Sequence, residues 1–173
     1  MISRIIQRLR QYFQSEPGYW WAIDGCWEEI NIHGTVNDFV STFERFPSHT
    51  QNILAAHCVV SEVTNGAIPQ LFLNGSGILA PEAVVALKEI GFEESAGALD
   101  AAISEIGLPY PRDRDDRIRI VGPLYSKNRS SLEEALLDRL LELTDAFLDG
   151  LGESCRDFEP RMMVYADRYR AGA

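Results

Sequence analysis

The longest amphipathic segment of the chain, residues 130–151, is the feature that most restricts its fold. Its apolar side chains recur every three or four residues, at Leu132, Leu136, Leu140, Leu143, Phe147 and Leu151. This period is that of one face of an α-helix. Ser130 or Ser131, with Glu133 or Glu134 three residues later, forms a capping box at its start. No alternation of period two lasts long enough to predict a sheet, so we expect an all-α fold, a single compact multi-helix domain.

Capping and breaking residues divide the rest of the chain into shorter elements. Thr35 with Asp38 begins one helix, and Ser48 begins the next. Asn65–Gly66 ends this second helix, because Asn and Gly accept a left-handed backbone. The remaining sequence predicts a short helical turn at 69–73, a loop at 74–77, helices over 81–90, 99–106 and 158–169, a mixed-charge loop at 111–117 and a short strand at 118–121.

Composition excludes several classes of protein. The 173 residues are 46% hydrophobic and 24% charged, which is typical of a globular chain. The 16 Lys and Arg residues against 26 Asp and Glu residues give a net charge of −10. Because phosphates require a basic surface, we expect no direct binding of nucleic acid. The longest uncharged stretch, 63–81, is interrupted by polar residues, Pro and Gly, so we also expect no membrane span.

The cysteines and the N-terminal sequence indicate a cytoplasmic protein. Cys26, Cys58 and Cys155 are odd in number and widely spaced, which favours free thiols in a reducing compartment. Residues 1–14 carry three arginines within their apolar pattern, unlike a signal peptide. We interpret 1–14 as an N-terminal amphipathic helix or extension that packs on its own domain or on a second copy of the chain. A helix on a membrane surface is the alternative.

The sequence contains no arrangement typical of catalysis or metal binding. His57 and Cys58 are adjacent, so on a helix they point about 100° apart and cannot act together as base and nucleophile. HExxH and CxxC motifs are absent, and the Gly-rich run 74–77 lacks the lysine of a phosphate-binding loop. We therefore expect a protein that is not an enzyme, with no catalytic residues, no metal and no cofactor.

Acidic residues are concentrated in two parts of the chain. Residues 15–111 hold two basic residues against 13 acidic ones. On the 130–151 helix, carboxylates recur at steps of three or four residues, about 5–6 Å along the axis, close to the separation of phosphates on a nucleic-acid strand. Such a row could replace DNA on a basic partner; the alternative is a solvated helix face. The expected partner-binding residues are Glu82, Glu89, Glu93, Glu94, Asp100 and Glu105, and on the long helix Glu134, Asp138, Glu142, Asp145 and Asp149.

Residues 62–77 carry a resemblance to a known family. The run E-V-T-N-G-A-I-P-Q-L-F-L-N-G-S-G resembles the signature E-V-x-N-G-G-x-x-Q-F-F-x-N-x-x-G of the bacterial DNA-mimic-protein-like family, long classed as a domain of unknown function. The chain departs from it at Ala67, where a second glycine is usual, and at Pro69. The weaker resemblance extends over about 30–170. The matching residues are Glu62, Asn65, Gly66, Gln70, Phe72, Asn74 and Gly77.

The resemblance implies an acidic, all-helical, homodimeric fold over residues 15–173, and one characterised member of the family acts as a DNA mimic. We expect the signature to hold the fold rather than to bind a ligand. Asn65 and Gly66 turn the chain, Gln70 and Asn74 hydrogen-bond exposed backbone ends, and Phe72 lies in the core.

The leading hypothesis is a non-enzymatic interaction protein that occupies the DNA-binding surface of a basic partner, such as a transcription regulator. One alternative is an immunity-type protein that neutralises a toxin. Another is a small-ligand module or enzyme that uses the 65–77 region. This last function requires a deep pocket lined by His57, Asn65, Gln70 and Asn74.

Overall fold

The computed structural model describes residues 18–26 and 29–170, and the regular elements in these ranges are all helical. The predicted all-α fold is thereby confirmed. The helix expected at 1–14 lies outside the described residues. The α-helices are α2 (Val36–Phe43), α3 (Ser48–Leu73), α4 (Ala80–Ile90), α5 (Glu93–Ile106), α6 (Arg114–Val121), α7 (Ser131–Asp149) and α8 (Phe158–Asp167), and the 3₁₀ helices are η1 (Trp20–Ala22), η2 (Asp24–Cys26), η3 (Gly75–Leu79), η4 (Gly122–Tyr125) and η5 (Glu153–Cys155).

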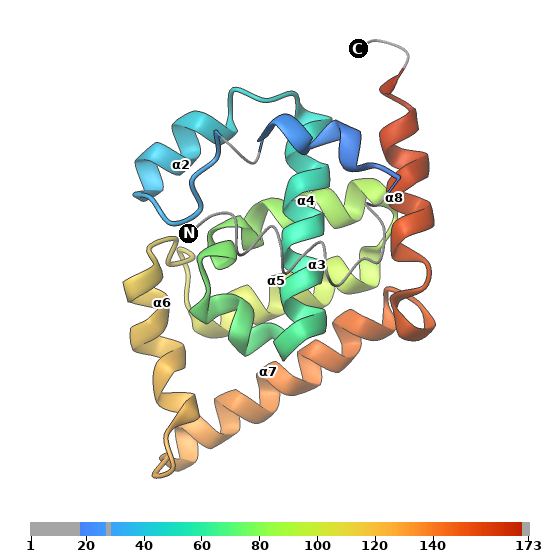
Figure 1. The fold of residues 1–173 in the computed structure, drawn as a ribbon. Helices are drawn as coiled ribbons and strands as arrows, with labels where there is room; N and C mark the ends of the chain where they lie inside the picture. The colour runs from blue at the N-terminus through green and yellow to red at the C-terminus, as the bar shows by residue number, and fades with distance from the viewer. Residues whose placement is uncertain (1–17, 27–28, 171–173) are drawn as a thin grey trace.

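Helix α3 runs through the middle of the molecule, and the other helices pack around it (Figure 1). It contacts α4, α6, α7 and α8 directly. Helix α5 packs against both α4 and α7, so the three form a continuous layer beside α3. Helix α7 crosses one side of the molecule in Figure 1, and α8 lies at its far end. This arrangement leaves the outer face of α7 without a covering element among the described residues.

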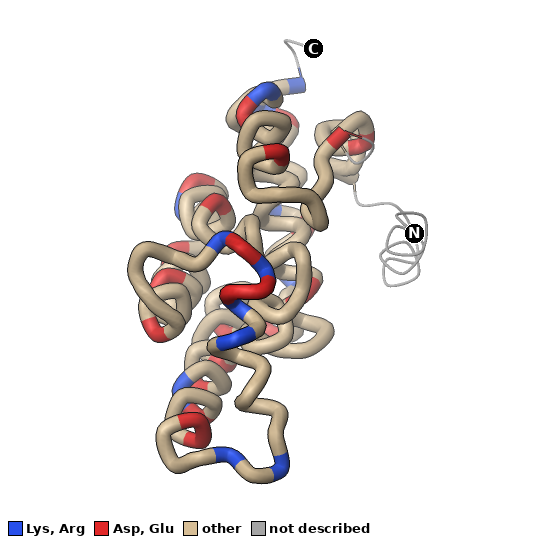
Figure 2. The backbone as a smooth tube through the Cα atoms, turned by 90° about the vertical axis from the view of Figure 1, so that its left-hand side faces the viewer, with Lys and Arg blue, Asp and Glu red and all other residues tan. Residues whose placement is uncertain are grey.

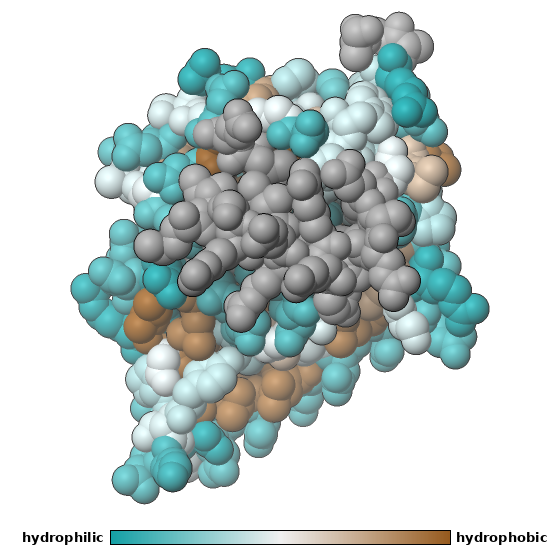
Figure 3. Space-filling view, viewed as in Figure 1, coloured by the Kyte–Doolittle hydropathy of each residue, from teal (hydrophilic) through white to brown (hydrophobic). Residues whose placement is uncertain are grey.

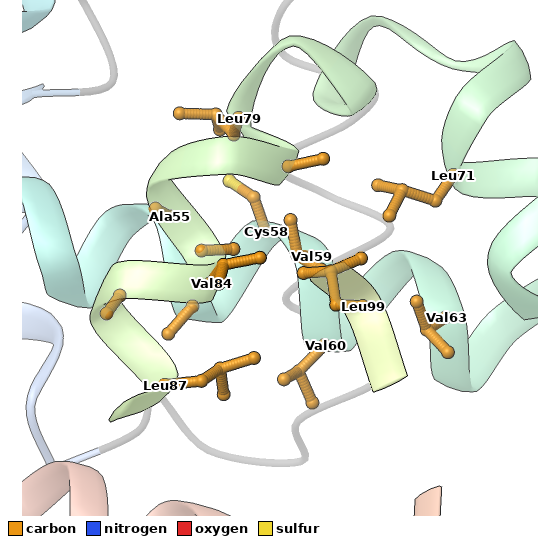
Figure 4. Packing of buried hydrophobic residues seen from close by; sticks show 14 of the residues in the cluster. Ala55, Cys58, Val59, Val60, Val63, Leu71, Leu79, Val84, Leu87 and Leu99 are labelled. Carbon is orange, nitrogen blue, oxygen red and sulfur yellow. The ribbon is translucent and has the colours of Figure 1, made fainter. Parts of the chain in front are cut away.

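The position of α3 follows from its sequence, because a helix that is apolar on all sides must be buried. Every side chain from Ile53 to Val60 is buried. Figure 4 shows residues of α3 facing Val84 and Leu87 of α4 and Leu99 of α5. In the described part of the chain, no single helix has the length and apolarity to cross a membrane; one bent pair, α3 with Gly75–Ile90, meets those criteria by length and composition alone.

The stop predicted at Asn65–Gly66 is a break inside α3, after which the helix continues to Leu73. Gly66 (φ −164°) and Ala67 (φ 69°, ψ 171°) leave the helical conformation, and Ile68 starts the second part. The hydroxyl of Thr144 on α7 accepts the Ile68 N–H at 3.1 Å, a donor that the break deprives of its helical acceptor. Pro69 fits in the first turn after the break, where a missing N–H costs little.

The loop predicted at 111–117 and the strand predicted at 118–121 are wrong from residue 114 onward, because 114–121 form α6. The Asp113 carboxylate caps this helix by accepting the N–H groups of Asp115 and Asp116 at 2.9 and 3.4 Å. The β-branched residues Ile118 and Ile120 suggested a strand, but the helix packs on α3 and no strand is available to pair with it among the described residues. The loop predicted at 74–77 likewise lies mostly in η3.

Candidate protein-interaction surface

Five of the predicted partner-binding residues form a row on the outer face of α7, here called the α7 carboxylate row. At about 100° per residue, the five fall within an arc of about 80°, and the row is about 22 Å long. Leu140, Leu143 and Phe147 are buried on the opposite side of the helix. All five carboxylates belong to exposed residues: Glu134, Asp138, Glu142, Asp145 and Asp149.

The start of α7 is held by the predicted capping box. Ser130 Oγ accepts the Glu133 N–H at 3.3 Å, and Glu133 Oε2 accepts the Ser130 N–H at 2.6 Å. These hydrogen bonds lower the pKa of Glu133. Farther along, the buried Thr144 and Phe147 anchor α7 to α3 and α5. The carboxylates of the row are therefore held by an anchored helix, which fixes their positions relative to a binding partner.

One arginine neutralises part of this surface. Arg139 Nη1 lies 3.2 Å from Glu142 Oε2, and its Nε lies 3.3 Å from Glu105 Oε1 on α5. Arg139 thus links α5 and α7 and offsets the charge of Glu142 within the row. No salt bridge within the described residues reaches the other four members, Glu134, Asp138, Asp145 and Asp149.

Helix α5 lies beside α7 and carries further exposed carboxylates. Ser95 Oγ near the start of α5 donates to Phe147 O near the end of α7 at 2.8 Å, and Glu105 at the other end of α5 meets Arg139, so the two helices run antiparallel. A Cβ placed on Gly150 would lie 3.1 Å from Glu94 Cβ, which brings the first turn of α5 next to the end of the α7 row. The exposed α5 carboxylates without a salt bridge in the described chain are Glu93, Glu94 and Asp100.

Glu82 and Glu89 on α4 lie apart from this surface. Glu82 is half-buried and pairs with Arg112 at 2.6 Å, so its charge is neutralised within the protein. Glu89 is exposed beside α8, where burial and, more weakly, the Glu89 charge raise the pKa of Tyr165. Figure 2 shows acidic residues on several helices and the alternating charges of the segment that leads into α6.

The signature residues make contacts within the fold, but Gln70 and Asn74 lack the backbone hydrogen bonds expected of their side chains. Phe72 is fully buried, as predicted. Asn65 Nδ2 donates to Ser61 O at 2.8 Å. Asn74 Nδ2 donates to the Glu62 carboxylate at 2.7 Å rather than to a backbone end. The Gln70 amide lies over Gly66, where a Cβ would be 2.0 Å from Gln70 Oε1.

The carbonyl groups of the signature are held by residues 110–117, a function that the sequence did not reveal. Tyr110 Oη donates to Gly77 O at 2.6 Å, Arg112 Nη1 to Ile78 O at 3.3 Å and Arg114 Nε to Leu73 O at 2.8 Å. The mixed-charge composition suggested a solvated loop, whereas its arginines donate hydrogen bonds to backbone carbonyls in the last turn of α3. The available sequence signal was Asp113 followed by two acidic residues, which is typical of a helix start.

Arg117 is the centre of this contact and is fully buried. Its Nε donates to Phe72 O at 3.0 Å and its Nη2 to Asn74 O at 2.9 Å, while Nη1 donates to Pro111 O and Arg112 O. Burial lowers the pKa of the guanidinium. A Cβ on Gly77 would lie 2.6 Å from Leu71 O and 2.8 Å from Arg117 Nε, so the signature glycine leaves room for this arginine.

These observations define the chain as an acidic all-helical protein with a row of exposed carboxylates on α7 and further exposed carboxylates on the neighbouring α5. Residues 44–169 match the family described as DMP19-like protein, which is well over half of the chain. The chain therefore belongs to the DMP19-like protein family, and the resemblance found from residues 62–77 is confirmed. In the comparisons with curated proteins and with solved structures, no match was found.

Proposed function

We propose that this chain is a non-enzymatic DNA mimic, whose α7 carboxylate row and neighbouring α5 carboxylates occupy the DNA-binding surface of a basic partner such as a transcription regulator. The observation that carries the proposal is the row itself: carboxylates at regular steps along about 22 Å of one rigid helix. Membership of the DMP19-like family supports it. Within the described residues, no group of three His, Cys, Asp or Glu side chains could hold a metal ion.

The ion pairs indicate which carboxylates contribute most. Glu134, Asp138, Asp145 and Asp149 have no salt bridge to break among the described residues before they meet a basic partner, whereas Glu142 already shares Arg139 with Glu105. Unpaired charges on a surface attract an oppositely charged partner over about 8–10 Å at moderate salt. Binding should therefore be fast, and it should weaken as salt is raised.

The test has two stages. The full chain is used to capture proteins from its native cells at low salt, and those released by high salt are purified. A captured protein is then bound to its DNA in a gel-shift assay, and the chain is added as competitor. The proposal expects the chain to displace the DNA, and it expects the double variant Asp138→Asn, Asp145→Asn to need about tenfold more protein to do so.

A matched control makes this result specific to the row. Asp116 and Glu153 are exposed and already paired with Arg119 and Arg156, so Asp116→Asn with Glu153→Gln removes the same charge elsewhere. This control should compete like the unmodified chain. Equal weakening by both double variants would refute the proposal, because it would show a response to net charge alone. Displacement of a toxin from its target, with no effect on any DNA complex, would favour the immunity function instead.

We further propose that the protein is a homodimer and works in the cytoplasm. Large exposed apolar side chains support association of two copies: Leu132 is 82% exposed and Leu108 75%. Figure 3 shows apolar residues gathered on the lower part of the visible face, over α7. Light scattering of the purified chain gives the stoichiometry. The three free cysteines support a reducing compartment.

The 65–77 region gives no support to a small-ligand or catalytic function. Asn65, Gln70 and Asn74 contact neighbouring residues of their own helix or Glu62, and they line neither the cavity between α3 and α8 nor the one beside the start of α6. His57 lines one of these cavities, but on the side of α3 that faces α8. These contacts do not support that alternative.

A further inference from the structure

A cleft of about 690 Å³ lies between α3 and α8, here called the α3–α8 cleft. Its walls are mostly apolar and include Val60 of α3 and Phe158, Met163 and Val164 of α8. Val164 is 61% exposed and Met163 40%, which is unusual for large apolar side chains that face a concave surface. The cleft therefore presents uncovered apolar surface to an occupant.

Polar groups in the cleft specify part of the occupant's chemistry. Glu159 and Asp167 are acidic lining residues. Two ion pairs neutralise part of the charge around the cleft, Arg156 with Glu153 and Asp167 with Arg170, which leaves Glu159 as the lining carboxylate without a salt bridge among the described residues. The cleft is thus suited to an apolar segment with basic side chains.

The chain enters the described structure at the edge of this cleft. The Gly18 N–H donates to Glu159 Oε1 at 3.3 Å, and a Cβ on Gly18 would lie 2.8 Å from Met163 Cε. Phe13 precedes Gly18 by five residues, which span at most about 18 Å. The residues before Gly18 are therefore tethered next to the cleft, at a high effective concentration.

The sequence of that segment complements the cleft. Ile2, Ile5, Ile6, Leu9 and Phe13 have the spacing of one helix face, and residues 1–14 contain three arginines and no acidic residue. We propose that the α3–α8 cleft is the binding site for residues 1–14 of the same chain, with the apolar residues against Val60, Phe158 and Val164 and the arginines beside Glu159 and Asp167. The cleft lies within the family match, residues 44–169, whereas the proposed occupant lies outside it.

Hydrogen exchange on the full chain tests this proposal. The amides of residues 1–13 should exchange at least about tenfold more slowly than in a synthetic peptide of the same sequence. The double variant Glu159→Gln, Asp167→Asn keeps the shape of both side chains and should reduce that protection about threefold, as should Val164→Ser on the apolar wall. The matched control is Asp145→Asn with Asp149→Asn on α7, which should leave the protection unchanged.

A chemical crosslink shows which chain supplies the occupant. Cys155 lines the cleft and is half-buried, whereas Cys26 and Cys58 are buried. A short bis-maleimide reagent should join Cys155 to the new thiol of Leu9→Cys within one chain, and Cys155→Ser should abolish the product. Exchange of residues 1–13 at the rate of the free peptide would overturn the proposal. A crosslink found only between two chains, or equal loss of protection in the α7 control, would also overturn it.

Discussion

Replacement of Arg117 by methionine should destabilise the protein strongly, because this arginine holds the end of α3 together with the segment before α6. Its guanidinium donates to four backbone carbonyls, on Phe72, Asn74, Pro111 and Arg112. Asn74 O also accepts the Gly77 N–H at 3.2 Å, so three carbonyls lose this donor without that second bond. At about 1 kcal/mol each the loss is about 3 kcal/mol, and removal of the buried charge offsets about 1 kcal/mol of it. The free energy of unfolding should therefore fall by about 2 kcal/mol, a large part of the total of a typical domain.

Urea unfolding followed by circular dichroism measures this loss, with the slope against denaturant checked for constancy. Arg114→Met is the matched control: Arg114 is exposed and makes one bond to the same region, to Leu73 O at 2.8 Å. It should cost less than about 1 kcal/mol. Arg117→Lys keeps the charge but cannot reach all four carbonyls, so its loss should lie between the two. A cost for Arg117→Met no greater than that for Arg114→Met would refute the role given to this contact.

Two further predictions concern the break in α3 and the buried histidine. Ala67 has φ 69° and ψ 171°, a conformation that favours glycine, so Ala67→Gly should raise the free energy of unfolding by about 1 kcal/mol; a loss of stability in the same urea assay would contradict this. Burial lowers the pKa of His57 to about 4, and Tyr19 Oη lies 2.8 Å from its Nδ1. The histidine of the unfolded chain titrates at about 6.5. The contribution of the neutral His57 to the free energy of unfolding is therefore complete above about pH 6.5 and is lost as the pH falls to about 4, a loss of up to about 3 kcal/mol. His57→Gln should flatten this part of the stability profile, and an unchanged slope between pH 6.5 and 4 would refute it.

Local sequence patterns predicted the secondary structure correctly wherever it depends on residues within a single helix. The capping box at Ser130 and the leucine period predicted α7, and both are present. Asn65–Gly66 predicted an interruption at the correct position, but not that the helix resumes, because that depends on Thr144 of α7 accepting the Ile68 N–H. Residues 114–121 were predicted wrongly, because local composition cannot show that Arg117 is buried against carbonyls 43 to 45 residues away.

The candidate site also has features that the sequence predicted and features that it could not predict. The sequence placed five carboxylates on one face of α7, since helical geometry alone sets their spacing. It could not show that Arg139 reaches Glu105 on α5, or that Arg112 neutralises Glu82 on α4, because the partners come from segments about 30 residues apart in the chain. The sequence also could not predict the cleft between α3 and α8, since the two walls of the cleft are about 100 residues apart in the chain.

The sequence by itself determined the helical class, the acidic charge, the family and the position of the α7 carboxylate row, because each depends on composition or on contacts within a few residues. The tertiary structure decided which carboxylates keep an unpaired charge, how the signature is held by Arg117 and where an apolar cleft lies open beside Gly18. These features depend on side chains from distant segments that meet only when the helices pack, and packing energy, not local preference, brings them together.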